Sequence, residues 1–385
     1  MIASARGSRK ARNAKGSAAL KLRFRPSVRR IRDYEAPEEG REGKLRLDFN
    51  ENTVGCSPGV LRALQTVTAE QLAMYPEYEN SVRRLSTYFG VQPAEMLLTN
   101  GVDDALRLLM EVFIEPGDAV LIPEPTFSMY RFFSQVAGAR VISVRYDQAM
   151  NFPVEATLRE LKRSPHILFI ANPNNPTGTM FDADATEAFI HRVPENVLVV
   201  LDEAYSDFAE HFARQRGTTY SRSFEYVRSG RQNVLVLRTF SKAHGLAGVR
   251  LGYGCGDPEL LRYFARVRNS FSISVVAEAA GLAAIRDEHH IRKTVENNAV
   301  GAAWLMERFK EIGVNAVPTS ANFIYFTVDE DASAFTARMQ SEGVIVRSLV
   351  PWGIPNAIRV SIGTPEQNET FFRALKKVVR QTVTP

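Results

Sequence analysis

Five short apolar runs recur along the middle of the chain, at residues 119–122, 141–144, 167–170, 197–201 and 234–237. Runs that are this short and nearly uninterrupted are typical of parallel strands buried on both faces. The stretches between them are long enough for crossover helices. Residues 82–89 and 105–113 carry apolar side chains at helical spacing. The pattern predicts an α/β fold, with a large three-layer α/β/α domain built on a mostly parallel sheet.

The C-terminal part of the chain has a different pattern. A long helix is expected at about residues 291–312, followed by strands in 322–328, 344–349 and 357–363. Helices are expected between and after these strands, at 332–342 and 367–379. This order predicts a smaller α+β domain at 289–385 beside a large domain at 53–288. Residues 26–52 are expected to pack with the small domain, after a basic tail at 1–25.

The charge of the chain is concentrated in that tail. Of its 48 basic residues, ten lie within residues 1–30, which contain no acidic residue; the rest therefore carries 38 basic against 43 acidic side chains. Four interpretations of the tail stay open: a disordered or spurious extension, an organelle transit peptide, a nucleic-acid-binding arm and a secretory signal. The third lacks interleaved aromatic residues, and the fourth lacks an apolar core after the charges. No nucleic-acid partner is expected for the folded part.

The composition excludes several classes of protein. The longest purely aliphatic run, 197–201, is far too short to span a membrane. The two cysteines, Cys56 and Cys255, form neither a disulfide framework nor a zinc motif. We expect no membrane partner and no metal. A cytoplasmic location is expected, with import into an organelle through the tail as the alternative.

Polar residues follow three of the predicted strands. Asn175 stands in ANPNNPTG after 167–170, Asp202 and Tyr205 stand in DEAY after 197–201, and Lys242 stands in RTFSK after 234–237. Ligands of such sheets bind beyond the carboxyl ends of the strands. Each residue alone also fits an ordinary role, as a turn, a helix cap, a core tyrosine or a surface lysine. Three strand ends of one sheet together indicate a shared site.

The combination suits pyridoxal 5'-phosphate. That cofactor needs a lysine amine, here Lys242, to bond its aldehyde and later to move a proton. It needs a carboxylate beside the pyridine nitrogen, for which Asp202 is the candidate. It also needs hydrogen-bond donors at its phenolic oxygen, for which Asn175 and Tyr205 are the candidates. Lys242, Asp202 and Tyr205 are therefore the expected catalytic residues.

The cofactor's phosphate needs hydroxyl groups, an arginine and the amides of a helix N-terminus. Ser241 and Arg250 flank Lys242 in TFSKAHGLAGVRLG, and TNGVDDA at 99–105 has the glycine and helix start that such an anion site requires. Phe127, in PEPTFSMY, is placed to cover a face of the ring. The expected cofactor contacts further include Thr239, Gly101, Val102 and Asp103.

With these motifs in order, the chain resembles the fold-type-I, pyridoxal-phosphate-dependent aminotransferases of class I and II. The resemblance runs from about Leu47 to the C-terminus. Within that family it is most similar to the branch that acts on histidinol phosphate, through LDFNENTVGCSP, MYPEYEN, TNGVDDAL, FSKAHGLAGVR, VIVRSL and IRVSIGT. The resemblance implies transamination between L-histidinol phosphate and 2-oxoglutarate, a step of histidine biosynthesis.

The resemblance also implies roles for residues outside the cofactor motif. Tyr75 in MYPE would reach the cofactor phosphate of a neighbouring subunit, which implies a homodimer with shared active sites. Arg359 would bind the anion of the substrate, and Arg347 would assist with a phosphate; arginine suits both carboxylate and phosphate. Asn52 would lie at the entrance and Tyr34 would cover the substrate.

The chain departs from the family pattern at several positions. Phe127 replaces a common tyrosine, Asp103–Asp104 replaces an Asp–Glu pair, and His244 follows the lysine where an aromatic residue is usual. His244 is interpreted as a packed residue, with a place in the cofactor shell as the alternative. Two other substrates stay open on the same scaffold, giving an aromatic amino acid aminotransferase or a threonine-phosphate decarboxylase. A transcription regulator would need a folded helix-turn-helix domain, which some thirty tail residues do not supply.

Overall fold

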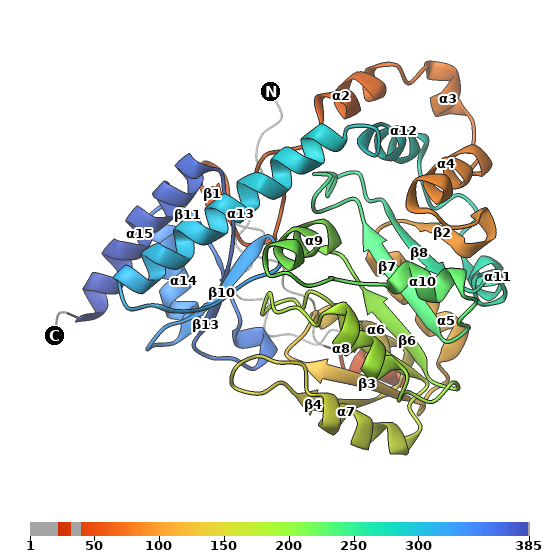
Figure 1. Cartoon of the computed structure of the whole chain (residues 1–385), viewed down its shortest axis with the longest axis horizontal. Coiled ribbons are helices and arrows are strands. Elements are labelled where there is room, and N and C mark those ends of the chain that lie inside the picture. The colour runs from red at the N-terminus through yellow and green to blue at the C-terminus, as the bar shows by residue number, and fades with distance from the viewer. Residues whose placement is uncertain (1–21, 32–39, 384–385) are drawn as a thin grey trace.

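The computed structural model describes residues 22–31 and 40–383. Its larger sheet has seven strands in the order β2-β8-β7-β6-β5-β3-β4 (Figure 1). Strands β7, β6, β5, β3 and β4 are parallel, whereas β8 lies antiparallel to both β7 and β2. The bounds are β2 Met96–Thr99, β3 Ala119–Glu124, β4 Arg140–Arg145, β5 Ile167–Ala171, β6 Leu198–Asp202, β7 Val234–Thr239 and β8 Gly252–Gly256.

The five strands expected from the apolar runs are confirmed, while β2 and β8 were not anticipated. Strand β8 reads GYGCG, and three glycines in five residues give almost no strand propensity. Its pairing with two neighbours overrides that local preference. At Gly252 a side chain is also excluded, because a Cβ there would lie 2.9 Å from the carbonyl carbon of Gly101.

Helices cover both faces of the large sheet. Consecutive strand residues belong to different cores: Val199 packs into one apolar cluster and Val200 into the other. Two cores on opposite faces of one sheet confirm the three-layer α/β/α architecture. The helices of this part are α2 Pro58–Gln65, α3 Ala69–Ala73, α4 Glu79–Phe89, α5 Val102–Phe113, α6 Ser128–Ala137, α7 Val154–Glu160, α8 Ala183–Ile190, α9 Ser206–Gln215, α10 Ser223–Arg228, α11 Pro258–Val267 and α12 Val275–Ala284, with short 3₁₀ turns η1 Pro93–Glu95 and η2 Leu161–Arg163.

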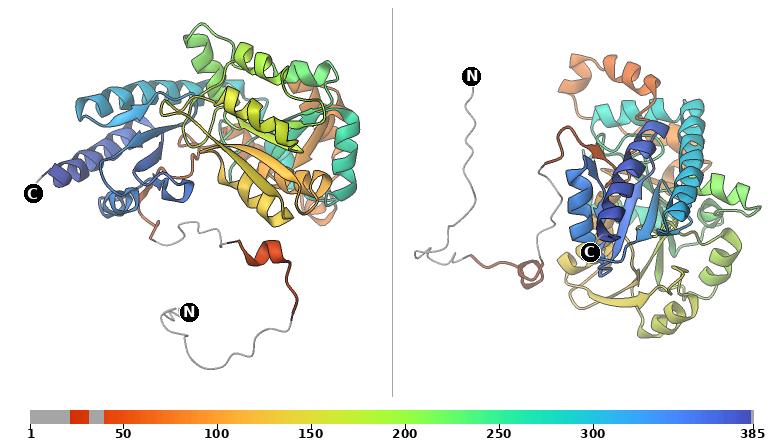
Figure 2. Two further views of the ribbon diagram at one scale, coloured as in Figure 1. Left: turned by 90° about the horizontal axis from the view of Figure 1, so that it is seen from below. Right: turned by 90° about the vertical axis from the view of Figure 1, so that its left-hand side faces the viewer.

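A second sheet of four antiparallel strands, in the order β12-β13-β10-β9, lies beside the first (Figure 2). Its strands are β9 Asn315–Val317, β10 Phe323–Thr327, β12 Arg347–Ser348 and β13 Ala357–Ser361. It packs with helices α13 Glu288–Glu311, α14 Ala332–Ser341 and α15 Pro365–Val383 around a separate apolar core, and the 3₁₀ turn η3 Val350–Trp352 follows β12. The proposed domain boundary at residues 288/289 falls in the first turn of α13.

The expected strand at 344–349 is divided in two. Strand β11 (Val344–Ile345) pairs in parallel with β1 (Leu45–Arg46), whereas β12 joins the four-stranded sheet. The chain therefore changes sheets at Val346. Residues 45–50 lie against this C-terminal part through β1 and through Asn50. In contrast, α1 (Pro26–Arg29) lies against α6, where the Ser27 hydroxyl donates to the carbonyl of Val136 at 3.1 Å.

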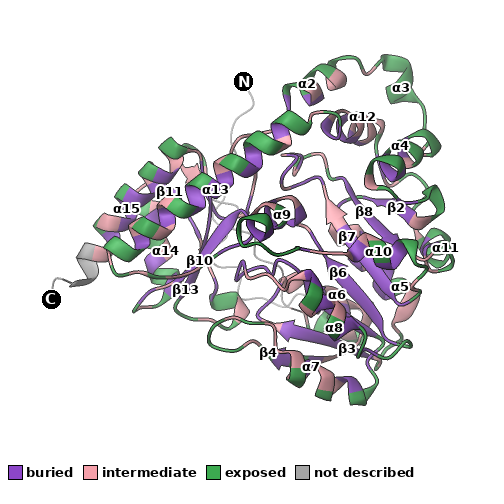
Figure 3. Ribbon diagram, in the orientation of Figure 1, coloured by how far each residue is buried: buried purple, intermediate pink, exposed green. Residues whose placement is uncertain are grey.

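Burial follows the layers: the central strands are buried and the outer faces of the helices are exposed (Figure 3). Over the described ranges, no helix combines the length and the apolarity needed to cross a lipid bilayer. Of the tail predicted at 1–25, residues 1–21 lie outside the described part.

Candidate active site

A cavity of about 500 Å³ lies between the carboxyl ends of the parallel strands, the four-stranded sheet and the segment 49–51. Most of the residues proposed from the sequence line it, although they come from distant parts of the chain. They are Val102, Asp103, Phe127, Asn175, Asp202, Tyr205, Thr239, Ser241, Lys242, Arg250, Arg347 and Arg359.

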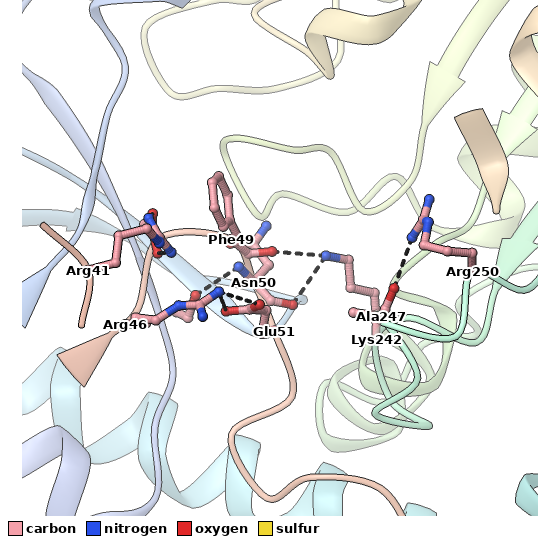
Figure 4. A network of polar contacts seen from close by, with 10 residues as sticks. Arg41, Arg46, Phe49, Asn50, Glu51, Lys242, Ala247 and Arg250 are labelled. Carbon is pink, nitrogen blue, oxygen red and sulfur yellow. Dashed lines mark hydrogen bonds and ion pairs between the residues drawn. The ribbon is translucent and has the colours of Figure 1, made fainter. Parts of the chain in front are cut away.

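Lys242 follows β7 and points at the N-terminal segment. Its Nζ donates hydrogen bonds to the carbonyl oxygens of Phe49 at 3.1 Å and Asn50 at 3.2 Å (Figure 4). Enclosure by protein disfavours the charged amine and lowers its pKa to about 8, and the nearby Arg359 guanidinium adds repulsion. A substantial fraction of the amine is therefore neutral, and nucleophilic, near pH 8.

Asp202 ends β6 and is buried. Its Oδ2 accepts a hydrogen bond from the Tyr130 hydroxyl at 2.7 Å, and its Oδ1 accepts one from the amide of Ala204 at 3.1 Å. Burial raises the pKa of Asp202 to about 6, although both hydrogen bonds oppose that shift. Sequence reasoning missed Tyr130; its only signal was a position three residues after Phe127, at the start of α6.

The two proposed phenolic-oxygen contacts are already hydrogen bonded to other cavity residues. The Tyr205 hydroxyl accepts from Nδ2 of Asn50 at 2.9 Å, and Oδ1 of Asn175 accepts from Nη1 of Arg359. Burial raises the pKa of Tyr205 to about 12. The Tyr205 hydroxyl therefore keeps its proton and remains a potential donor.

The N-terminus of α5 lies beside Arg250, and the two form a cup suited to an anion. Gly101 precedes the helix with φ +75°, and a Cβ there would lie 2.6 Å from Nη2 of Arg250, so only glycine admits the guanidinium this close. Nη1 of Arg250 is held by the carbonyl of Ala247 at 3.0 Å. The Thr239 hydroxyl donates to Oγ of Ser241 at 3.0 Å on the same side. Helix amides, hydroxyls and a guanidinium together favour a phosphate.

Arg347 and Arg359 face each other directly across β12 and β13. Like charges at opposed positions of an antiparallel pair destabilise a sheet. Arg359 is buried, and its Nη2 also donates to the carbonyl of Asp48 at 2.6 Å. Two guanidinium groups on one side of a cavity indicate that the cavity receives an anion there.

Glu203 and Arg238 form a buried ion pair next to the cavity, which the sequence did not reveal. Oε2 of Glu203 accepts from Nη2 of Arg238 at 2.7 Å and from the Ser223 hydroxyl at 2.8 Å. Glu203 directly follows the last residue of β6, and Arg238 is the second-last residue of β7. The ion pair therefore fixes the ends of these two strands relative to each other.

Four proposed residues do not line the cavity. The Asn52 amide donates to the carbonyl of Ala243 at 2.8 Å, and Gly101 lies behind Arg250. Tyr75 is 76% exposed and stacks on Phe271 with ring centroids 4.3 Å apart. Tyr34 lies outside the described residues.

His244 is also outside the lining. Its buried ring packs against Phe240 at 4.8 Å between centroids, which agrees with its interpretation as a packed residue. Within residues 22–31 and 40–383, no group of His, Cys, Asp and Glu side chains is arranged to hold a metal ion.

Comparison with known proteins identifies relatives along almost the whole chain. Residues 42–375 match the family model described as aminotransferase class I and II. The histidinol-phosphate aminotransferase of Moorella thermoacetica is 40% identical over 89% of this chain and 87% of its own, and that of Symbiobacterium thermophilum is 38% identical over 91% and 97%. The crystal structure of histidinol-phosphate aminotransferase from Sinorhizobium meliloti in complex with pyridoxal-5'-phosphate superposes with a TM-score of 0.85 at 27% identity, covering 95% of this chain and 100% of that one. The chain belongs to the class I and II aminotransferase family.

Proposed function

We propose that the cavity binds pyridoxal 5'-phosphate. The observation that carries this proposal is the pairing of an anion cup, made by α5 and Arg250, with a buried carboxylate, Asp202, and an amine, Lys242, in one cavity. The donors and the positive charge of the cup fit a phosphate, and the carboxylate fits a protonated pyridine nitrogen. When bound, this cofactor supplies an electron sink for the bond-breaking at the substrate's α-carbon.

The residues of the chain would then divide the work. Lys242 would bond the cofactor through its amine and, once displaced by the substrate amine, would carry the α-proton. Asp202 would keep the ring nitrogen protonated, held in place by Tyr130 and Ala204. Tyr205 and Asn175 would donate to the phenolic oxygen, and Phe127 would cover one face of the ring.

As substrates we propose L-histidinol phosphate and 2-oxoglutarate, which would exchange to imidazole-acetol phosphate and glutamate in histidine biosynthesis. The names of the relatives support this reaction, and so does the arginine pair, which lines the same cavity as the cup. Arg359 would bind a carboxylate or a phosphate, and Arg347 would assist with the phosphate.

We further propose a cytoplasmic homodimer in which Tyr75 reaches the partner's cofactor phosphate. Tyr75 is not among the residues that line its own cavity; its ring stacks on Phe271, and both rings are exposed. Asn52 and Tyr34 remain proposed contacts near the substrate entrance. The proposed division at 26–52, 53–288 and 289–385 would place the cavity between the two larger parts.

The test is a half-reaction without keto acid. The cofactor-loaded protein is mixed separately with L-histidinol phosphate, L-phenylalanine and L-phosphothreonine, and the absorption of the lysine-bound cofactor is followed. Saturable loss of that absorption with histidinol phosphate, far faster than with phenylalanine, is expected. Preference for phenylalanine would make the protein an aromatic aminotransferase, and release of carbon dioxide from phosphothreonine would make it a decarboxylase. A colourless protein that binds no cofactor would contradict the proposal itself.

A further inference from the structure

The guanidinium of Arg347 lies close to two aromatic rings that come from different parts of the chain. Its Cζ is 5.9 Å from the ring centroid of Phe49, on the N-terminal segment, and 5.3 Å from that of Trp352, in η3. All three side chains line the cavity. Across the described ranges, no carboxylate forms an ion pair with Arg347. Aromatic rings hold a cation without using its N–H groups, so the donors of Arg347 stay available for an anion.

Arg347 needs such support because its cross-strand partner repels it. Arg359 stands directly opposite on β13, and that guanidinium is fixed by Asn175 and Asp48. An unsupported Arg347 would be free to turn toward solvent, away from the like charge. The two rings oppose that movement, so they keep two positive groups on one side of the cavity.

Trp352 is itself anchored to the opposite side of the cavity. Its indole Nε1 donates to the carbonyl of Thr126 at 2.8 Å, in the loop between β3 and α6. That loop is held in turn, because the Thr126 hydroxyl donates to Oδ1 of Asn174 at 2.8 Å. Thr126 directly precedes Phe127, the residue proposed to cover the cofactor ring. A single side chain thus links the arginine pair to the loop that carries Phe127.

We propose that Trp352 is a positioning residue that gives the enzyme its preference for a phosphate-bearing amine, by holding Arg347 beside Arg359 through its ring and its indole hydrogen bond. This inference rests on the proposed function and names the part of the site that would select its substrate. The substrate's phosphate would bind the N–H groups that the two rings leave free.

The test compares two substrates that differ only in the phosphate, L-histidinol phosphate and L-histidinol, in the half-reaction described above. Trp352→Phe keeps a ring but removes the indole donor, and Trp352→Leu removes both. The matched control is Trp304→Phe, because Trp304 also lies near an arginine, Arg308 at 5.6 Å, but packs on Phe372 in the C-terminal core. Melting temperatures check that each variant is folded.

For histidinol phosphate we expect Trp352→Phe to raise the half-saturating substrate concentration of the half-reaction about fivefold, the effect of one hydrogen bond, with the limiting rate almost unchanged. Trp352→Leu should raise that concentration about thirtyfold, since the cation–π contact is lost as well. For histidinol the limiting rate divided by the half-saturating concentration should change less than about twofold in every variant, and Trp304→Phe should match the parent with both substrates.

The outcomes separate this inference from the proposed function. Suppose the parent protein prefers histidinol phosphate, but Trp352→Phe weakens half-saturation equally with both substrates or with neither of them. The role assigned to Trp352 is then wrong and the proposed substrate stands. If the parent protein does not distinguish the two substrates, the proposed phosphate substrate is wrong, and the selectivity assigned to Trp352 is wrong with it.

Discussion

Two sides of the cavity are built in opposite ways. The strand-end wall, formed by Asn175, Asp202 and Lys242, takes one functional residue from the end of each of three parallel strands. The arginine wall, formed by Arg347 and Arg359, takes both residues from neighbouring antiparallel strands at opposed positions. The first arrangement distributes unlike groups, whereas the second concentrates like charges.

The two walls differ in the source of their unfavourable free energy. In the strand-end wall the cost lies in burial: Asp202 is a desolvated carboxyl and Lys242 a desolvated amine, and a bound cofactor would relieve both. In the arginine wall the cost lies in repulsion, which only an anion relieves. Each wall is therefore incomplete without its ligand, but for a different physical reason.

Of the substitutions considered, Lys242→Ala in the strand-end wall should cause the largest loss of activity. We expect turnover to fall by about 10³-fold or more, because the variant has neither the amine that bonds the cofactor nor the group that moves the proton. The matched control is Lys293→Ala, at an exposed position of α13. Borohydride reduction of the loaded protein followed by peptide mass analysis should attach the cofactor to Lys242 alone. Attachment to any other lysine would contradict the assignment.

Asp202→Asn should change stability and activity in opposite directions. In the cofactor-free protein the raised pKa of Asp202, from 3.8 to about 6, means that proton binding stabilises the fold below about pH 4, and this stabilisation is lost as the pH rises through 6. The neutral amide avoids burying that charge, so the variant should gain up to about 3 kcal/mol of unfolding free energy at pH 8.

Urea unfolding of the cofactor-free proteins at pH 8 and pH 5 measures this difference, which should shrink at pH 5. Turnover of the loaded variant should nevertheless fall by about 10²-fold or more, since the charge beside the ring nitrogen is gone. Asp329→Asn, at an exposed position, is the control. An equal stability difference at both pH values would show that Asp202 is not the titrating group.

Arg359→Lys tests the arginine wall. A lysine cannot hold Asn175 and the Asp48 carbonyl while also offering a second donor to the substrate, so kcat/KM for histidinol phosphate should fall about thirtyfold. The absorption of the lysine-bound cofactor should be retained. Arg373→Lys, on the exposed face of α15, is the control. Loss of cofactor binding in Arg359→Lys would contradict the assignment of substrate binding to one wall and cofactor binding to the other.

The strand-end wall could be predicted from sequence because each of its residues lies within five positions of the end of an apolar run. Asp202 and Lys242 need no knowledge of strand pairing: the end of a buried parallel strand is enough to place them together. Tyr130 and the Glu203–Arg238 pair were missed, because which polar groups meet below the surface depends on packing between elements that the pattern does not specify.

The arginine wall could not be derived in this way. Arg347 and Arg359 came only from family resemblance, since β12 has two residues and the register across β13 leaves no mark in the local pattern. Strand β8 was missed because three glycines in five residues leave no apolar strand pattern. Trp352 carried no sequence signal, and its link to Thr126 is a contact between residues 226 positions apart.

The segment that carries Phe49 and Asn50 also has a consequence for synthesis. The amide of Asn50 donates to the hydroxyl of Ser361, 311 residues later, and Leu45 pairs with Val344. A ribosome makes the first partner of each contact early and the second near the end, so this wall of the cavity closes only after almost the entire chain has emerged. Nascent chains that stop before residue 344 lack the strand that seats this segment, and activity should arise late, as one of the final events of folding.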